Sequence, residues 1–491
     1  NTATEESSAG GGGGGGGGRS LPLVCEIRPA AAVSLGRLVV GQPSTLLPFL
    51  LKAVGDAAAV EKPDASSGLD VSRAAYSQRL SFYYLLQALR EAVVNLLEIN
   101  AIDCIRANLD TLWSLLLANS GRPEEGSRNL VAECLGRISL ISPQLLIGRL
   151  QTQLNSPEAA NSALTRCTLV TAAKYILVVS EGGAAGTFFE TTDPATPHSA
   201  EASASPGGFL DRAGDNPTRF PFEEAESVLC GSGGASEGAV PLTDFLARLL
   251  DPDLNVRKAA LLTLNTAAHH RSGLLIRPLL NRPLVSTVLT SGGEWKSGPP
   301  TLLQVLYRET LVRPELIREV EMGPFKRQED DGLELRKSAY ECLSTLLDNC
   351  VDSLQMSDFL DLLINGLKDH NDIRLLVYHM LQRIIQLQPL EVTQKMEQLV
   401  GPLKAVLLAR PKQDWVKQEL DKMEELKRCA TVVIVDFRNL IDIEKNRYYL
   451  DLLHTIDSER TLKATYDQVL STAERSTRVS RESLSSGMPF S

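Results

Sequence analysis

The 491-residue chain has few of the residues that build sheets. Aromatic residues make up only 5% of it, whereas apolar residues of all kinds make up 43%. This balance favours helix packing over a sheet core, because strands prefer aromatic and β-branched side chains. No apolar run approaches the roughly 18 residues that a membrane-spanning helix needs, and the best one, residues 429–435, is far shorter. We therefore expect an all-α protein with no membrane partner.

Sequence motifs for catalysis, metal binding and nucleotide binding are also missing. The six histidines form no HExxH or HxH pattern, the eight cysteines form no CxxC pair, and no P-loop occurs. The one GxSxG match, at residues 234–238, lies in a segment rich in Gly, Ala and Ser and not between a strand and a helix, so it does not indicate a nucleophile elbow. The formal net charge of −10 argues against a nucleic-acid partner, because phosphate contacts require a basic surface. We expect no enzymatic activity, no cofactor and no metal site.

The cellular location is inferred from the cysteines and from the start of the chain. Scattered cysteines are typical of reduced core thiols in an intracellular protein. Asn1 begins the chain and no signal-peptide core follows it. We interpret the chain as a fragment or processed product that is located in the cytoplasm and the nucleus.

Segments of biased composition interrupt the chain, and we expect them to be irregular or flexible. They are residues 1–24, 64–70, 181–238, 291–300 and 471–491. The first contains an unbroken glycine tract, and the third is rich in Gly, Ala, Ser, Thr and Pro, with a short helix expected near residues 222–229. Such compositions bury too little apolar surface to offset the entropy of ordering. Helical repeats are predicted for residues 25–180 and 239–470.

The remaining sequence repeats with a period near 40 residues. Arginines that begin predicted helices follow one another at intervals of 38, 91, 79 and 38 residues, at Arg128, Arg166, Arg257, Arg336 and Arg374. The interval of 91 contains the insertion, and 79 is close to two periods. Two helices per unit of about 40 residues are typical of HEAT and armadillo repeats. The predicted fold is a HEAT-type α-solenoid of about eight or nine units.

Acidic residues precede four of these arginines. They are Glu125, Asp253, Asp331 and Asp369. A carboxylate at the start of a helix can cap its free N–H groups, and the arginine can reach the carboxylate of an adjacent repeat. We interpret these residues as structural rather than as partner contacts.

One segment, residues 313–332, departs from the helical pattern. Val320 and Met322 alternate with Glu319 and Glu321, as they would in a strand. The Gly323–Pro324 pair then indicates a turn. A short β-hairpin projecting from the solenoid fits this pattern, and so does an ordinary loop after a frayed helix end.

Five strings in this chain are similar to the C-terminal region of the cullin-associated, neddylation-dissociated protein family. They are GSRNLVAECLGRISLI (126–141), DPDLNVRKAAL (251–261), ELIREVEMGPFK (315–326), GLKDHNDIR (366–374) and VKQELDKMEELKR (416–428). They occur in the same order as in the family, between about residues 34 and 428. The low-complexity stretches that separate them are not normally found in the family.

This resemblance implies a binding function. Family members are HEAT solenoids that wrap a cullin–RING complex lacking its ubiquitin-like modifier, and they are not enzymes. In their C-terminal arm a β-hairpin occupies part of the adaptor's site, which promotes exchange of adaptor and substrate receptor. This chain has no counterpart of the N-terminal arm, so it should not cover the modification site.

The resemblance places the hairpin at residues 317–328 of this chain. Its expected partner-contacting residues are Glu319, Val320, Glu321, Met322, Pro324, Phe325 and Lys326. The insertion at residues 291–300 lengthens the connection that leads to it. The alternative is a generic HEAT-repeat scaffold, such as a transport receptor or a phosphatase-type subunit, which has no need of such a segment.

Overall fold

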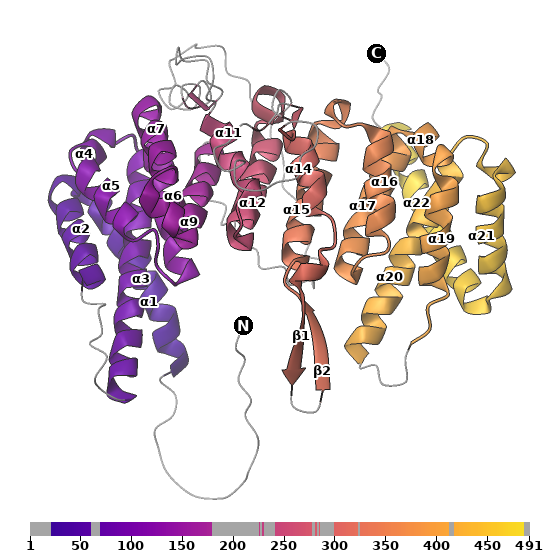
Figure 1. Ribbon diagram of the computed structural model, residues 1–491, viewed down its shortest axis with the longest axis horizontal. Helices are drawn as coiled ribbons and strands as arrows, with labels where there is room; N and C mark the ends of the chain where they lie inside the picture. The colour runs from indigo at the N-terminus through magenta and orange to yellow at the C-terminus, as the bar shows by residue number, and fades with distance from the viewer. Residues whose placement is uncertain are drawn as a thin grey trace, which may run out of the picture. The chain divides into compact units, whose positions relative to one another are not determined.

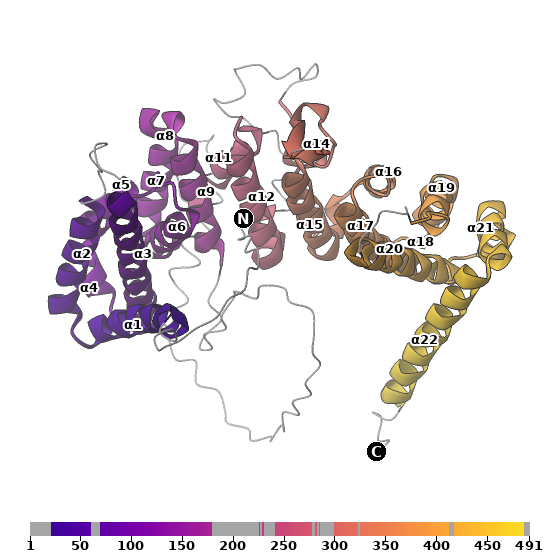
Figure 2. The same cartoon turned by 90° about the horizontal axis from the view of Figure 1, so that it is seen from below.

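The structure is a computed structural model, and all of its described elements are helical except one hairpin (Figures 1 and 2). It describes residues 21–59, 69–178, 225, 228–229, 241–276, 280–281, 284, 299–322, 325–411 and 417–485. The chain divides into two compact units, Asn1–Ile141 and Ser142–Ser491. The predicted all-α class is confirmed. None of the described helices is long and apolar enough to cross a membrane.

The first unit is built around one long helix, α3, which packs against α1, α2 and α6. Its buried side chains recur every three or four residues, at Phe82, Leu86, Leu89, Val93 and Leu96. At Gly36 the backbone of α1 approaches α3 so closely that a Cβ atom would lie 2.6 Å from the carbonyl oxygen of Ala88. The helices of this unit are α1 (Leu21–Gly41), α2 (Pro43–Ala59), α3 (Leu69–Glu98), α4 (Ile102–Arg106), α5 (Leu109–Ala118) and α6 (Glu125–Ser139).

The second unit contains a row of helices in which each packs against the next, and the first four are seen side by side in Figures 1 and 2. These inner helices are α9 (Ala163–Leu177), α12 (Leu254–His270), α15 (Leu333–Asn349), α17 (Asn371–Leu387), α20 (Lys417–Asp436) and α22 (Arg460–Ser485). Each also packs against one outer helix. The outer helices are α7 (Pro143–Leu154), α11 (Pro241–Leu246), α14 (Leu302–Glu309), α16 (Met356–Gly366), α19 (Met396–Leu407) and α21 (Arg447–Ser458).

Short helices complete the second unit. They are α8 (Pro157–Asn161), η1 (Ala247–Leu250), η2 (Ser272–Ile276), η4 (Pro314–Leu316), η5 (Val351–Ser353), α18 (Pro389–Gln394), η6 (Phe437–Asn439) and η7 (Ile443–Lys445). Stacked helical hairpins of this kind are the HEAT arrangement, in which neighbouring pairs bury a continuous core. On α15, for example, Leu335, Ala339, Leu343 and Leu346 recur every three or four residues and are all buried.

The predicted boundaries of the irregular segments differ from the structure at both ends. α1 begins at Leu21, inside the segment predicted to end at residue 24. The proline in its first turn is compatible with this start, because the N–H group that proline lacks would have no partner within the helix there. α22 continues to Ser485, although a flexible tail was predicted from residue 471. Leu462 anchors its first turn in the core, and no Gly or Pro occurs before the end of the helix.

The predicted insertion at residues 181–238 lies almost entirely outside the described residues. Ala225, Val228 and Leu229 are described as helical, and they fall within the short helix expected there. Ala225 and Leu229 are both buried. The segment at residues 291–300 lies outside the described residues except for its last two positions.

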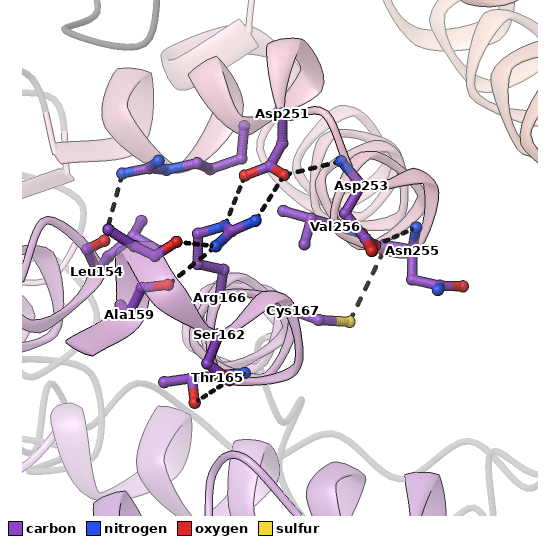
Figure 3. A network of polar contacts seen from close by, with 12 residues as sticks. Leu154, Ala159, Ser162, Thr165, Arg166, Cys167, Asp251, Asp253, Asn255 and Val256 are labelled. Carbon is purple, nitrogen blue, oxygen red and sulfur yellow. Dashed lines mark hydrogen bonds and ion pairs between the residues drawn. The ribbon is translucent and has the colours of Figure 1, made fainter. Parts of the chain in front are cut away.

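A buried arginine joins α9 to the repeat that contains α12 (Figure 3). The Arg166 guanidinium donates to both carboxylate oxygens of Asp251, over 2.7 and 3.0 Å, and its Nη1 donates to the carbonyl oxygens of Ala159 and Ala160. Asp253 accepts from two backbone N–H groups of the first turn of α12. The predicted contact between an arginine and the carboxylate of an adjacent repeat is confirmed here, with Asp251 as the partner. Asp253 caps its helix as predicted, whereas Glu125, Asp331 and Asp369 are not the capping residues of α6, α15 and α17.

Candidate partner-binding site

The segment at residues 313–332 contains the hairpin. Strands β1 (Ile317–Met322) and β2 (Phe325–Asp330) are antiparallel, with Ile317 paired to Asp330 and Met322 paired to Phe325. The hairpin projects past the end of α15 (Figure 1). Of the two readings that the sequence left open, the structure selects the hairpin, and β2 ends two residues beyond the predicted limit of 328.

The charged residues predicted for partner contact lie exposed on paired strands. The Lys326 ammonium is 3.3 Å from a Glu319 oxygen and 3.8 Å from a Glu321 oxygen. All three side chains are more than half exposed, so these ion pairs stabilise the hairpin only weakly. They remain accessible to a partner. Val320, between the two glutamates, is half-buried.

The remaining predicted contact residues lie at the tip. Met322 and Phe325 are the last paired residues of the two strands, but their side chains lie outside the described part of the chain, as does all of Pro324. The backbone therefore places both residues next to the turn at the tip of the hairpin.

Polar contacts close the base of the hairpin. The Asp331 N–H donates to the carbonyl oxygen of Leu316 over 3.1 Å, and Arg318 forms an ion pair with Asp331 at 2.9 Å. At Gly332 a Cβ atom would lie 3.1 Å from the Leu316 side chain. Close packing at this point fixes where the strands leave the helical layer.

Two buried charges lie next to the ends of the hairpin. On the upstream side, Arg313 donates to Glu309 over 2.6 Å. On the downstream side, the Nη1 atom of Arg336 lies 2.9 Å from the Asp330 carboxylate. Burial opposes the charge of Arg336, but its contacts with Asp369 and Asp330 outweigh that cost and raise its pKa. Sequence analysis identified Arg336 as a repeat marker and missed its contact with the hairpin.

A groove of about 700 Å³ lies between α14 and α16, beside the segment that leads into β1. Leu311 and Val312 line it and are about half exposed, while Tyr307 and Asp358 form part of its wall. The Tyr307 hydroxyl is buried without a hydrogen-bond partner among the described residues. Its burial, together with the charge of Asp358, raises the pKa of Tyr307. The sequence analysis did not predict this groove.

Within the described part of the chain, no three His, Cys, Asp or Glu side chains lie close enough together to hold a metal ion. The described residues instead form two surface features at this place. They are an exposed, charged hairpin on a helical scaffold and a half-apolar groove beside its base.

Comparison with known proteins identifies the family. The family model "TATA-binding protein interacting (TIP20)" matches residues 297–468, which include the whole hairpin. The chain is 33% identical over 444 residues to cullin-associated NEDD8-dissociated protein 2 of Mus musculus. It is 30% identical over 429 residues to cullin-associated NEDD8-dissociated protein 1 of Arabidopsis thaliana. The chain belongs to the cullin-associated NEDD8-dissociated protein family.

The alignments with these relatives cover most of this chain and a smaller part of each relative. They cover 90% and 87% of the chain, but only 28% of the mouse protein and 27% of the Arabidopsis protein. Among solved structures, Kap121p bound to RanGTP matches with a TM-score of 0.50 at 12% identity, over 91% of this chain and 36% of that one. At that identity the likeness shows the helical-repeat fold alone. The predicted family and fold are both confirmed.

Proposed function

We propose that this chain is a non-enzymatic, cullin-binding scaffold of the cytoplasm and nucleus. It binds a cullin–RING complex that lacks its ubiquitin-like modifier, and it competes there with the adaptor and substrate receptor. The hairpin displaces the adaptor, with Glu319, Val320, Glu321, Met322, Pro324, Phe325 and Lys326 as its contact residues.

One observation carries the proposal. The matched family region contains a projecting β-hairpin, whereas a row of stacked helical pairs buries its core without one. Strand residues with exposed charges present both side chains and backbone groups to a partner. The relatives' names associate them with cullins, which supports the choice of partner.

Binding to purified cullin–RING complexes tests the proposal. The chain should bind the unmodified complex and bind the modified one more weakly or not at all, as measured by titration calorimetry at equal concentrations. A charge-neutralised hairpin, E319Q/E321Q/K326Q, is a matched test variant because it removes the exposed charges without placing like charges opposite each other on the two strands. It should fold normally and bind less well than the parent. If the parent chain binds neither complex, the proposal is wrong.

A transport-receptor role, which the helical repeats alone left open, draws no support from the likeness to Kap121p, because that likeness shows only the fold.

A further inference from the structure

The upstream end of the hairpin is connected to the preceding repeat through a buried carboxylate. Glu309, at the end of α14, has a fully buried side chain. One of its oxygens accepts from Arg313, which immediately precedes η4 and β1, over 2.6 Å. Its other oxygen lies 3.6 Å from the Nε atom of Arg257 on α12, close enough for an ion pair. A chain of three charges therefore runs from the hairpin's upstream leg to α12.

The downstream end is connected to the following repeat through a buried arginine. The Arg336 side chain on α15 is only 3% exposed. Its Nε and Nη2 atoms each donate to Asp369, just before α17, over 2.9 Å. Its Nη1 atom forms the ion pair with Asp330, the last residue of β2. A second chain of three charges therefore runs from the hairpin's downstream leg to the start of α17.

These two arrangements differ from the inter-repeat contact in Figure 3. There, Arg166 joins Asp251 and two backbone carbonyls of its own repeat, and no third charge leads to a projecting element. Beside the hairpin, each buried ion pair contacts one further charged residue. This residue is Arg313, just before the hairpin, or Asp330, at the end of β2. A two-stranded hairpin is marginally stable by itself, so its direction depends on what holds its two ends.

We infer that these two chains of three charges position the hairpin, because each one fixes one leg of the hairpin to a different neighbouring repeat. We call the two chains relays, and their members are Arg257–Glu309–Arg313 and Asp330–Arg336–Asp369. Separating the members of a buried ion pair is costly. The hairpin therefore keeps one direction relative to α12 and α17 together. Arg313 and Asp330 are positioning residues, since both act through the direction of the strands.

A double variant separates positioning from general stability. R313M/D330N removes only the outer member of each relay. The Glu309–Arg257 and Arg336–Asp369 pairs remain, so no buried charge loses its only partner. Met retains the aliphatic length of Arg313. Asn retains the oxygen that accepts from the Gly332 N–H, a bond of 2.9 Å in the parent chain.

The matched control is R166Q/D251N, which neutralises a comparably buried pair that contacts neither Arg313 nor Asp330. Electron–electron distance measurements on the full chain supply the readout. Spin labels are attached to p-acetylphenylalanine, which spares the native cysteines. One label replaces exposed Glu321 on β1, and the other replaces exposed Leu262 on α12 or exposed His379 on α17.

We expect a single narrow distance maximum for both label pairs in the parent chain and in R166Q/D251N. In R313M/D330N that single maximum should be lost for both pairs, while the thermal midpoint falls no further than in the control. A distribution in R313M/D330N as narrow as the parent's would overturn the inference. So would equal broadening in R166Q/D251N.

A measurement of adaptor release extends the test. It rests on the proposed function, and the two kinds of failure can be told apart. R313M/D330N should bind the cullin complex but accelerate adaptor release less than the parent chain. If the distances broaden while adaptor release is unchanged, the relays position the hairpin as inferred and the hairpin's proposed role is wrong. If the distances stay narrow, the inference about the relays is wrong whatever the release rate.

Discussion

The Arg166–Asp251 contact gives a quantitative prediction about what holds adjacent repeats together. Arg166 and Asp251 are 8% and 2% exposed. Replacing Arg166 alone by Gln leaves a buried carboxylate without its charged partner and frees the carbonyls of Ala159 and Ala160. Breaking a buried pair from one side costs about 3–5 kcal/mol, so R166Q should lower the free energy of unfolding of this region by about that much.

Neutralising both partners should cost much less. R166Q/D251N leaves no orphan charge, and amide hydrogen bonds each contribute about 1 kcal/mol net. Urea unfolding of the full chain gives the midpoints, and peptide-level hydrogen exchange of α9 and α12 shows where stability is lost. The single variant should exchange faster in both helices than the double variant does. If the double variant is as unstable as R166Q, the pair contributes net attraction beyond its desolvation cost and the reasoning is refuted.

Three further variants test other parts of the second unit. At Gly366 a Cβ atom would lie 2.6 Å from the Tyr340 hydroxyl, so G366A should destabilise by about 1–3 kcal/mol through overpacking, measured as a lower urea midpoint. D253A removes the cap of α12 and should cost about 1 kcal/mol, with faster hydrogen exchange confined to the first turn of that helix. Burial raises the pKa of Asp436 despite the hydrogen bond from Gln382, so its ionised form destabilises the fold. D436N should therefore raise the thermal midpoint at pH 7, and this gain should shrink as the pH falls through the raised pKa, because the folded parent then takes up a proton before the unfolded chain does.

The helical repeats were predictable from the sequence because their signals are local and repeated. The scarcity of aromatic residues favoured helices over strands, and the recurring arginines identified the period. The partner of each arginine was less predictable. Arg166 selects Asp251 while Asp253 caps α12, and this choice depends on how the backbone turns before the helix begins.

The hairpin was predictable as one of two alternatives, since alternation around Val320 and the Gly323–Pro324 turn also fit a loop. Its anchoring was not predictable. Glu309 and Arg313 are spaced like any surface pair four residues apart on a helix, and only the structure shows the carboxylate to be buried. The groove beside Leu311 depends on the separation of α14 and α16, which no local pattern encodes.

The adaptor's dissociation rate tests the central claim most directly. A labelled adaptor is bound to an unmodified cullin–RING complex, and its release is followed in excess unlabelled adaptor, with no scaffold, with the parent chain, and with a variant in which residues 319–326 are replaced by a Gly/Ser loop. The parent chain should accelerate release. The loop variant should remain folded and still bind the cullin in part, through the helical surface, but adaptor release should return towards the unassisted rate. Equal acceleration by the loop variant would contradict the account, because displacement would then originate elsewhere on the solenoid.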